Sequence, residues 1–195
     1  TLLIDQNDKL GGIANQLNTT WKNEPVQTHL ETLKKRVLGN ELIKVYPSTT
    51  LNAVSGFVGS YTGELMINGE AESIEFGAAV IATGANEYKP DEYLYGQDDR
   101  VVTPLEFHSM MKGHPDLIHN LNSVAFIQCV GSRNEEHPYC SRICCAQAIT
   151  NAVMLKKENP DMDLFILYRD IRTYSDRELL YKEARDLGII FIPYK

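Results

Sequence analysis

The sequence predicts an α/β chain with two Rossmann-like units built on parallel sheets. In the C-terminal half, strand-like segments alternate with helical segments, and such alternation implies right-handed crossovers between parallel strands. In the N-terminal half, a strand ending in an acid is followed by a double glycine, a helix, a strand meander and a second apolar run. The 195 residues are 43% hydrophobic and 23% charged, a composition that is ordinary for a globular chain and argues against disorder.

The N-terminal half contains one clear helix signal. Val26, Leu30, Leu33 and Val37 recur at spacings of three and four, which predicts an amphipathic helix over 26–38 that Gly39 and Asn40 stop. Strands are expected at 1–4, 43–46, 49–54, 58–67 and 72–76. The continuous apolar run at 78–82 predicts a fully buried strand.

The C-terminal half begins after a polar stretch at 86–100, which is the best candidate linker. Thr103 is expected to cap a short helix that opens with Pro104. Strands are then expected at 123–130, 163–168 and 188–192, and helices at 143–157 and 177–187. The predicted organisation is a first unit at 1–90, a linker with a short helix at 91–122 and a second unit at 123–195.

The net charge and the chain ends limit which classes of function are expected. A net charge of −7 argues against a broad nucleic-acid-binding face, and no apolar run approaches the roughly 18–20 residues that span a bilayer. The chain starts with Thr1 instead of Met, has no signal-peptide pattern, and starts and stops at strand-like segments. We expect an internal piece of a longer protein.

The first unit carries a candidate dinucleotide site. An acid at the end of the second strand of such folds bonds a ribose hydroxyl, and Asp5 is placed for that role. Gly11 and Gly12 would let backbone approach a pyrophosphate, and Thr83-Gly84 ends the apolar run. This order, over roughly residues 1 to 90, resembles the FAD-binding half of the thioredoxin-reductase and disulfide-reductase flavoproteins. The glycine-rich turn expected before Asp5 is absent, and the alternative is an ordinary set of turn residues.

All four cysteines lie in one stretch, at Cys129, Cys140, Cys144 and Cys145. Four thiolates suit zinc or an iron–sulfur cluster, but the paired C-x-x-C spacing of zinc ribbons and of ferredoxins is missing. The cysteines fall between a strand end and a helix start, where a phosphate loop belongs and where the helix N-terminus favours anions. A [4Fe–4S] site is predicted. Structural zinc, a redox-active dithiol and inert buried cysteines stay open.

Several charged and polar residues flank the cysteines. Arg133 and Arg142 add positive charge, and Arg142 and Gln128 are candidates for tuning a cluster by hydrogen bonding. Adjacent cysteines on a regular helix diverge by about 100°, so Cys144 and Cys145 can both ligate one cluster only if the helix start is bent. Arginines after the second strand of this unit indicate a docking surface or a solvated loop, with nicotinamide phosphate binding as the alternative.

Three stretches carry a more specific resemblance: GAAVIATGANEYKP, FIQCVGSRNEEHPYCSRICC and LYRDIRTYSDRELLYKEARDLGIIFI. They resemble the family formed by the A subunit of heterodisulfide reductase, nearly end to end. The resemblance implies a thioredoxin-reductase-like flavoprotein core with added iron–sulfur clusters. It also implies FAD contacts and cluster ligands at matching positions. These are Asp5, Gly11, Gly12, Thr83 and Gly84 for FAD, and Cys129, Cys140, Cys144 and Cys145 for [4Fe–4S].

The expected function is that of an electron-transfer component in a heterodisulfide-reductase-like oxidoreductase, passing electrons between FAD and the cluster. We expect a cytoplasmic protein. The resemblance implies other subunits of the complex as partners, together with a hydrogenase or dehydrogenase. It also implies that the full protein is a homodimer. This piece is expected to be incomplete for catalysis, and no catalytic residue is identified. The alternatives are a flavin-dependent disulfide oxidoreductase using a Cys144–Cys145 dithiol and a zinc-stabilised interaction module.

Overall fold

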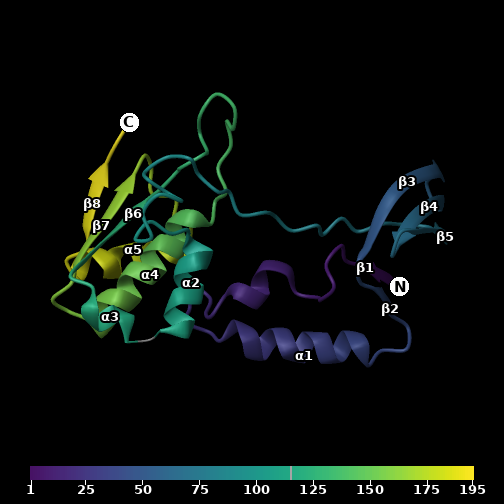
Figure 1. Ribbon diagram of the computed structural model, residues 1–195, viewed down its shortest axis with the longest axis horizontal. Helices are drawn as coiled ribbons and strands as arrows, with labels where there is room; N and C mark the ends of the chain where they lie inside the picture. Colours follow the sequence, from purple (N-terminus) through teal and green to yellow (C-terminus); the bar gives the residue numbers. More distant parts are fainter. Residues whose placement is uncertain (115) are drawn as a thin grey trace. The chain divides into compact units, whose positions relative to one another are not determined.

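The computed structural model describes residues 1–114 and 116–195. The chain forms two compact units, one from residues 1–20 and 25–86 and the other from residues 21–24 and 87–195 (Figure 1). Within the second unit, the Arg177 guanidinium lies 5.6 Å from the centre of the Trp21 ring. No helix among the described residues is long and apolar enough to cross a membrane.

The first unit opens with a small parallel sheet. Strand β1 (Leu2–Ile4) pairs with β2 (Lys44–Tyr46), and the crossover between them contains the 3-10 helix η1 (Gly12–Gln16) and helix α1 (Val26–Leu38). The bounds of α1 confirm the periodicity-based prediction. The Gln27 side-chain amide donates to the carbonyls of Ala14 and Leu17 at 2.9 and 2.7 Å, and so fastens η1 to α1.

A three-stranded antiparallel meander follows, as the sequence predicts. It contains β3 (Thr49–Phe57), β4 (Ser60–Ile67) and β5 (Glu70–Phe76) in the order β3-β4-β5. Gly59 and Gly69 adopt φ of 85° and 88° in the two tight turns, a backbone conformation that glycine reaches without strain. A bulge lies between Leu51 and Ala53.

The buried strand predicted at 78–82 is wrong. This run has no regular secondary structure, and Val80 and Ile81 are 93% and 87% exposed. A strand that is buried on both faces needs paired neighbours and covering layers. The two-stranded β1–β2 sheet is too small to bury both faces of a third strand.

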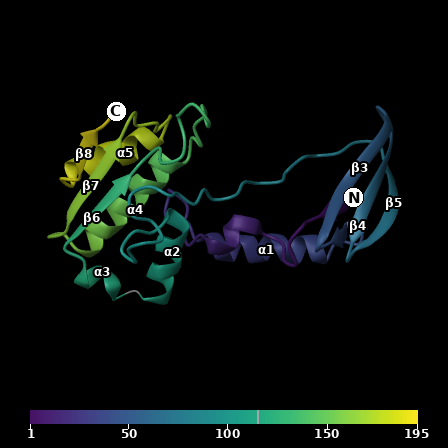
Figure 2. The same cartoon turned by 45° about the horizontal axis from the view of Figure 1, so that its top comes forward.

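The second unit is a parallel α/β sheet. It contains β6 (Ser123–Ile127), β7 (Asp163–Tyr168) and β8 (Ile190–Pro193) in the order β6-β7-β8, which lie side by side in Figures 1 and 2. Helix α4 (Cys144–Glu158) connects β6 to β7, and α5 (Arg177–Asp186) connects β7 to β8. Helices α2 (Pro104–Gly113) and α3 (Leu117–Asn120) precede β6. The predicted strand–helix alternation is confirmed.

The core of this unit lies between the sheet and α4. Ile149 and Leu155 of α4 and Ile166 of β7 have no exposed surface, and Leu164 is 2% exposed. Burying each such side chain contributes about 1.5–3 kcal/mol. Phe107 of α2 packs into the same cluster. Helix α4 is therefore held against the sheet along its length, which fixes the position of its first turn.

The polar segment before α2 is fastened to that helix. Thr103 and Glu106 form a reciprocal capping box, which confirms the predicted cap. Lys89 Nζ lies 2.9 Å from a Glu87 oxygen and 2.7 Å from a Glu106 oxygen, and the Tyr95 hydroxyl donates to Glu106 at 2.7 Å. Burial raises the pKa of Glu106, but hydrogen bonds from Lys89, the Thr103 N–H and Tyr95 outweigh it and hold that pKa at about 2.

This arrangement predicts a pH-dependent contribution from Glu106. Its pKa in the folded chain lies below the ordinary 4.5, so the contribution is present above about pH 4.5 and is lost as the pH falls toward 2. Glu106→Gln should weaken the start of α2 by about 1 kcal/mol at pH 7, because the side chain is 37% exposed and partly screened. Hydrogen exchange of the amides at 104–108 measures the loss. Glu158→Gln, an exposed carboxylate of the same unit, is the control, and equal protection in wild type and Glu106→Gln at pH 7 would contradict the assignment.

Candidate functional site: the cysteine loop

The loop after β6 turns back sharply at its first residues. Cys129, Gly131 and Arg133 have φ of 64°, 65° and 59°, and the Ser132 N–H donates to the Cys129 carbonyl at 3.2 Å. Left-handed backbone ends the strand, which explains why β6 stops at Ile127 instead of continuing to the predicted 130. Such conformations cost about 1–3 kcal/mol for a non-glycine residue and persist only when surrounding contacts hold them.

Two cysteines form the first turn of α4. The Cys144 N–H donates to Ser141 Oγ at 3.4 Å, and Cys145 Sγ lies 3.6 Å from the Asp170 carbonyl oxygen. Cys145 is buried, whereas Cys144 is half-buried. A side-chain hydrogen bond between the two cysteines is the main cause of the pKa shift at Cys144.

The hydrogen bond divides the two thiols into an acceptor and a donor. It lowers the pKa of Cys144 to about 6, with further help from Ser141 and from backbone N–H groups at the helix start. The same bond, together with burial, raises the pKa of Cys145. Near neutral pH, Cys144 is therefore the thiolate and Cys145 the thiol.

The other two predicted ligands differ in their placement. Cys129 is buried and lies close enough to Cys145 for charge on one to raise the pKa of the other. Cys140 Sγ accepts from the Arg142 N–H at 3.3 Å. Within residues 1–114 and 116–195, no three histidine, cysteine, aspartate or glutamate side chains form a group suited to a metal ion. The structure thus places Cys129 near Cys145, but among the described residues the cysteines do not form a metal-binding group.

Residues that follow β7 hold this loop in place. Arg133 Nη2 lies 2.5 Å from Asp170 Oδ2, and Arg169 Nη1 donates to the Arg133 carbonyl at 2.7 Å. The Tyr194 hydroxyl donates to the Gln128 carbonyl just before Cys129. The cysteine loop is therefore supported by side chains from the carboxyl ends of β7 and β8.

Aromatic rings pack against the same loop. The Tyr88 ring lies where a side chain at Gly131 would stand, so only glycine fits there. The His137 ring is 6.2 Å from Tyr88 and 5.6 Å from Tyr139, centre to centre. Sequence reasoning missed Tyr88 because it sits in a polar stretch far before Gly131 in the chain and carries no local pattern.

The predicted flavin contacts lie in the first unit. Asp5 directly follows β1, and its carboxylate accepts from the Asn7 N–H at 2.9 Å. Gly11 and Gly12 start η1 with φ of 114° and 47°, and they lie on the same loop after β1. Thr83 and Gly84 lie in the extended segment that has no regular structure. The loop after β1 therefore holds three of the five predicted residues.

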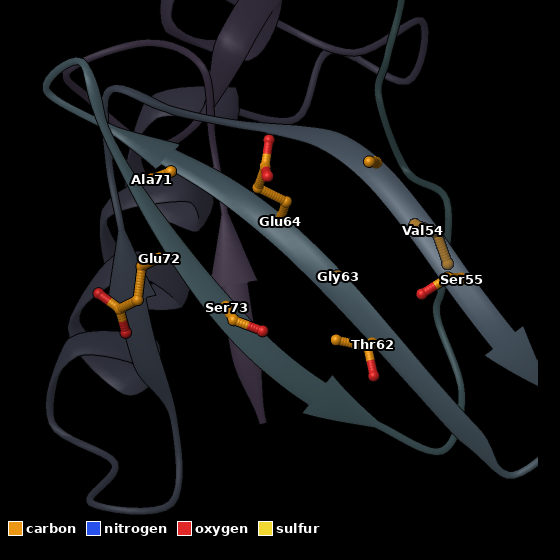
Figure 3. A pocket seen from close by; sticks show the side chains of 9 residues that line it. Val54, Ser55, Thr62, Gly63, Glu64, Ala71, Glu72 and Ser73 are labelled. Atoms are coloured by element: carbon orange, nitrogen blue, oxygen red, sulfur yellow. The ribbon is translucent and has the colours of Figure 1, made fainter.

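A separate hollow lies on the meander. Its volume is about 360 Å³, and residues of β3, β4 and β5 line it. Figure 3 shows the side chains of these residues. Small side chains such as Ala53 and Ser73 line it together with Glu64 and Glu72. None of its lining residues is a predicted site residue, so the cysteine loop remains the candidate site.

Known proteins were compared with this chain, and no family model matches it. It is 38% identical over 136 residues to the A subunit of the H(2)/formate:CoB-CoM heterodisulfide,ferredoxin reductase of Methanococcus maripaludis. It is 37% identical over 139 residues to the A subunit of the H(2):CoB-CoM heterodisulfide,ferredoxin reductase of Methanothermobacter thermautotrophicus. These matches cover 62% and 63% of this chain, and 21% of each relative. The chain thus corresponds to about a fifth of the length of these relatives.

Solved structures show the fold group. The chain superposes on T. acidophilum thioredoxin reductase with a TM-score of 0.51, 10% identity and coverage of 97% of this chain and 54% of that one. It superposes on the bacillithiol disulfide reductase of Bacillus cereus with a TM-score of 0.50 and 16% identity. That superposition covers 98% of this chain and 59% of the reductase. The predicted fold, with Rossmann-like units of the thioredoxin-reductase type, is confirmed.

The thiol pair predicts selective alkylation in the metal-free chain. Cys144 should react fastest with iodoacetamide at pH 7, with a rate that falls as the pH drops through about 6, because the thiolate is the nucleophile. Cys145→Ala should move this midpoint toward the ordinary value of 9, since the Cys145 hydrogen bond is the main cause of the shift. Mass spectrometry of the labelled peptides gives the rates. Cys140→Ala is the matched control, and a Cys144 midpoint near 9 in wild type would show that the pair is not coupled in this way.

Proposed function

We propose, from the homology of this chain to a segment of the A subunit of heterodisulfide reductase, that it belongs to an oxidoreductase which transfers electrons between FAD and a four-cysteine iron–sulfur cluster. The homologues are named as reductases, and the structural neighbours are thioredoxin and disulfide reductases. The observation that supports the proposal is the placement of Cys129 just after β6 and of Cys144 and Cys145 at the start of α4, with the pKa of Cys144 lowered to about 6.

The chemistry of the cysteine loop fits an anionic, sulfur-rich group. Cys129, Cys140, Cys144 and Cys145 would hold it, and a bound [4Fe–4S] cluster supplies one-electron transfer. Thiolates must be deprotonated to bind iron, and the low pKa of Cys144 reduces the cost of that step. The first turn of α4 adds backbone N–H groups and the positive end of the helix dipole.

The loop after β1 fits a dinucleotide. Asp5 would accept a hydrogen bond from a ribose hydroxyl, and Gly11 and Gly12 would leave room for a pyrophosphate. Bound FAD supplies the conversion between two-electron and one-electron chemistry. Thr83 and Gly84 complete the proposed contacts. In this proposal residues 1–90 belong to an FAD-binding domain, 91–122 connect it, and 123–195 form the unit that carries the cluster.

The names of the relatives suggest the setting of the longer protein. They describe subunits, and they mention H(2), formate and ferredoxin. We therefore propose a cytoplasmic complex with other heterodisulfide-reductase-like subunits, a hydrogenase or dehydrogenase as a source of electrons, and a homodimer of the full protein.

A second function has one observation in its favour. Cys144 and Cys145 form a thiolate–thiol pair, which is the arrangement that a dithiol oxidoreductase needs for disulfide exchange. In that case the pair would cycle between dithiol and disulfide, with the flavin as its electron donor. This function needs two cysteines, whereas the cluster needs all four.

The number of cysteines required separates the two functions. The 195-residue chain, purified without oxygen, should contain iron and acid-labile sulfide in equal amounts and should absorb near 400 nm. Cys140→Ser should lose at least nine-tenths of the iron, because Cys140 is the fourth ligand, whereas Ser132→Ala in the same loop should keep it. Stoichiometric zinc without iron would overturn the cluster. Full disulfide-exchange activity in a metal-free Cys140→Ser chain would favour the second function.

A further inference from the structure

Two guanidinium nitrogens near the cysteine loop are buried and have no hydrogen-bond partner. They are Arg133 Nη1 and Arg169 Nε, and no other side-chain nitrogen or oxygen among the described residues is left in this state. Leaving a buried donor unpaired costs about 1–3 kcal/mol, more for a charged group, so native structures rarely leave one. These two donors therefore point to an acceptor that completes the site.

Both side chains are fixed by their other nitrogens. Arg133 Nη2 pairs with Asp170 at 2.5 Å, and Arg169 Nη1 donates to the Arg133 carbonyl at 2.7 Å. The Asp170 carbonyl in turn lies 3.6 Å from Cys145 Sγ. The unpaired donors are thus held within the same few residues that support Cys129 and Cys145.

Arg133 also interacts with the side chain of Cys129. The hydrogen bond to Asp170 raises the pKa of Arg133, burial lowers it, and a hydrogen bond to the Cys129 side chain raises it further, so the guanidinium lies beside that sulfur. The arginine suggested by the sequence, Arg142, is exposed. The Arg133 side chain is 23% exposed, so solvent screens its charge less than that of Arg142.

We propose that Arg133 and Arg169 are positioning residues that donate their free N–H groups to the sulfur atoms of the cysteine-bound cluster and so raise its reduction potential. This inference rests on the proposed cluster. Reduction adds negative charge, so donors that face the sulfurs stabilise the reduced form more than the oxidised form. The two arginines affect the electron affinity of the cluster and its retention, but they do not bind its iron atoms.

Arg133→Gln and Arg169→Gln in the iron-loaded 195-residue chain test this role. At a fixed solution potential near the wild-type midpoint, the ratio of reduced to oxidised cluster should fall at least tenfold in each variant. That ratio corresponds to a shift of about 59 mV to more negative potential for a one-electron couple. A redox titration followed by electron paramagnetic resonance gives the midpoint, and iron analysis gives the retained cluster.

Matched variants separate hydrogen bonding from other causes. Arg142→Gln removes an arginine from the same loop and the same left-handed backbone region, with φ of 63° against 59° for Arg133. It should leave the midpoint unchanged. Asp170→Asn breaks the ion pair of Arg133 but keeps the guanidinium, so the midpoint should stay or rise. An equal negative shift in either variant would overturn the proposal, since the effect would then be general charge or loop position.

Failure of this inference is distinguishable from failure of the proposed function. Wild-type chain without iron would contradict the cluster, and this inference with it. Iron-loaded wild type with Arg133→Gln and Arg169→Gln at an unchanged midpoint would overturn only the role of the arginines. If Arg133→Gln releases its iron, Arg133→Lys should restore it in part through the retained charge. Equal iron loss in Arg133→Gln and Arg142→Gln would count against the proposal.

Discussion

The candidate site depends on the hydrogen bonds that tie the loop after β6 to the segment after β7. Cys129 and Arg133 adopt left-handed backbone conformations, which a free loop would leave. The bond from Arg169 to the Arg133 carbonyl and the ion pair between Arg133 and Asp170 hold that conformation. The buried face of α4 fixes the position of its first turn. Because the loop ends at that turn, Cys129 at the start of the loop comes near Cys145.

One physical preference accounts for the kind of chemistry at this edge. The carboxyl end of a parallel sheet, followed by a helix N-terminus, favours negative charge. In a dinucleotide fold that charge is phosphate, and a glycine-rich loop brings it close. In this chain the corresponding loop carries cysteines and is braced by arginines, so the same preference favours thiolate. At Cys144, the interaction with Cys145 lowers the thiol pKa and so favours the thiolate further.

Features with local causes could be predicted from the sequence. The spacing of apolar residues predicted the bounds of α1, and Thr103 with Glu106 formed the expected cap of α2. The apolar run at 78–82 failed because hydrophobicity reports a tendency to be buried, and burial of a strand depends on neighbours that are distant in the chain. Arg133 could be noted only as nearby charge, since its pairing with Asp170 links positions 37 apart. Tyr88 carried no signal at all, because its packing on Gly131 is a tertiary contact.

The central claim is that the four cysteines bind iron together at the carboxyl end of β6. Anomalous X-ray diffraction from crystals grown without oxygen, collected on both sides of the iron absorption edge, tests it most directly. The account predicts iron density within about 2.3 Å of the sulfur atoms of Cys129, Cys140, Cys144 and Cys145, a typical metal–thiolate distance. Absence of iron density there, with a Cys144–Cys145 disulfide or a zinc signal in its place, would contradict it.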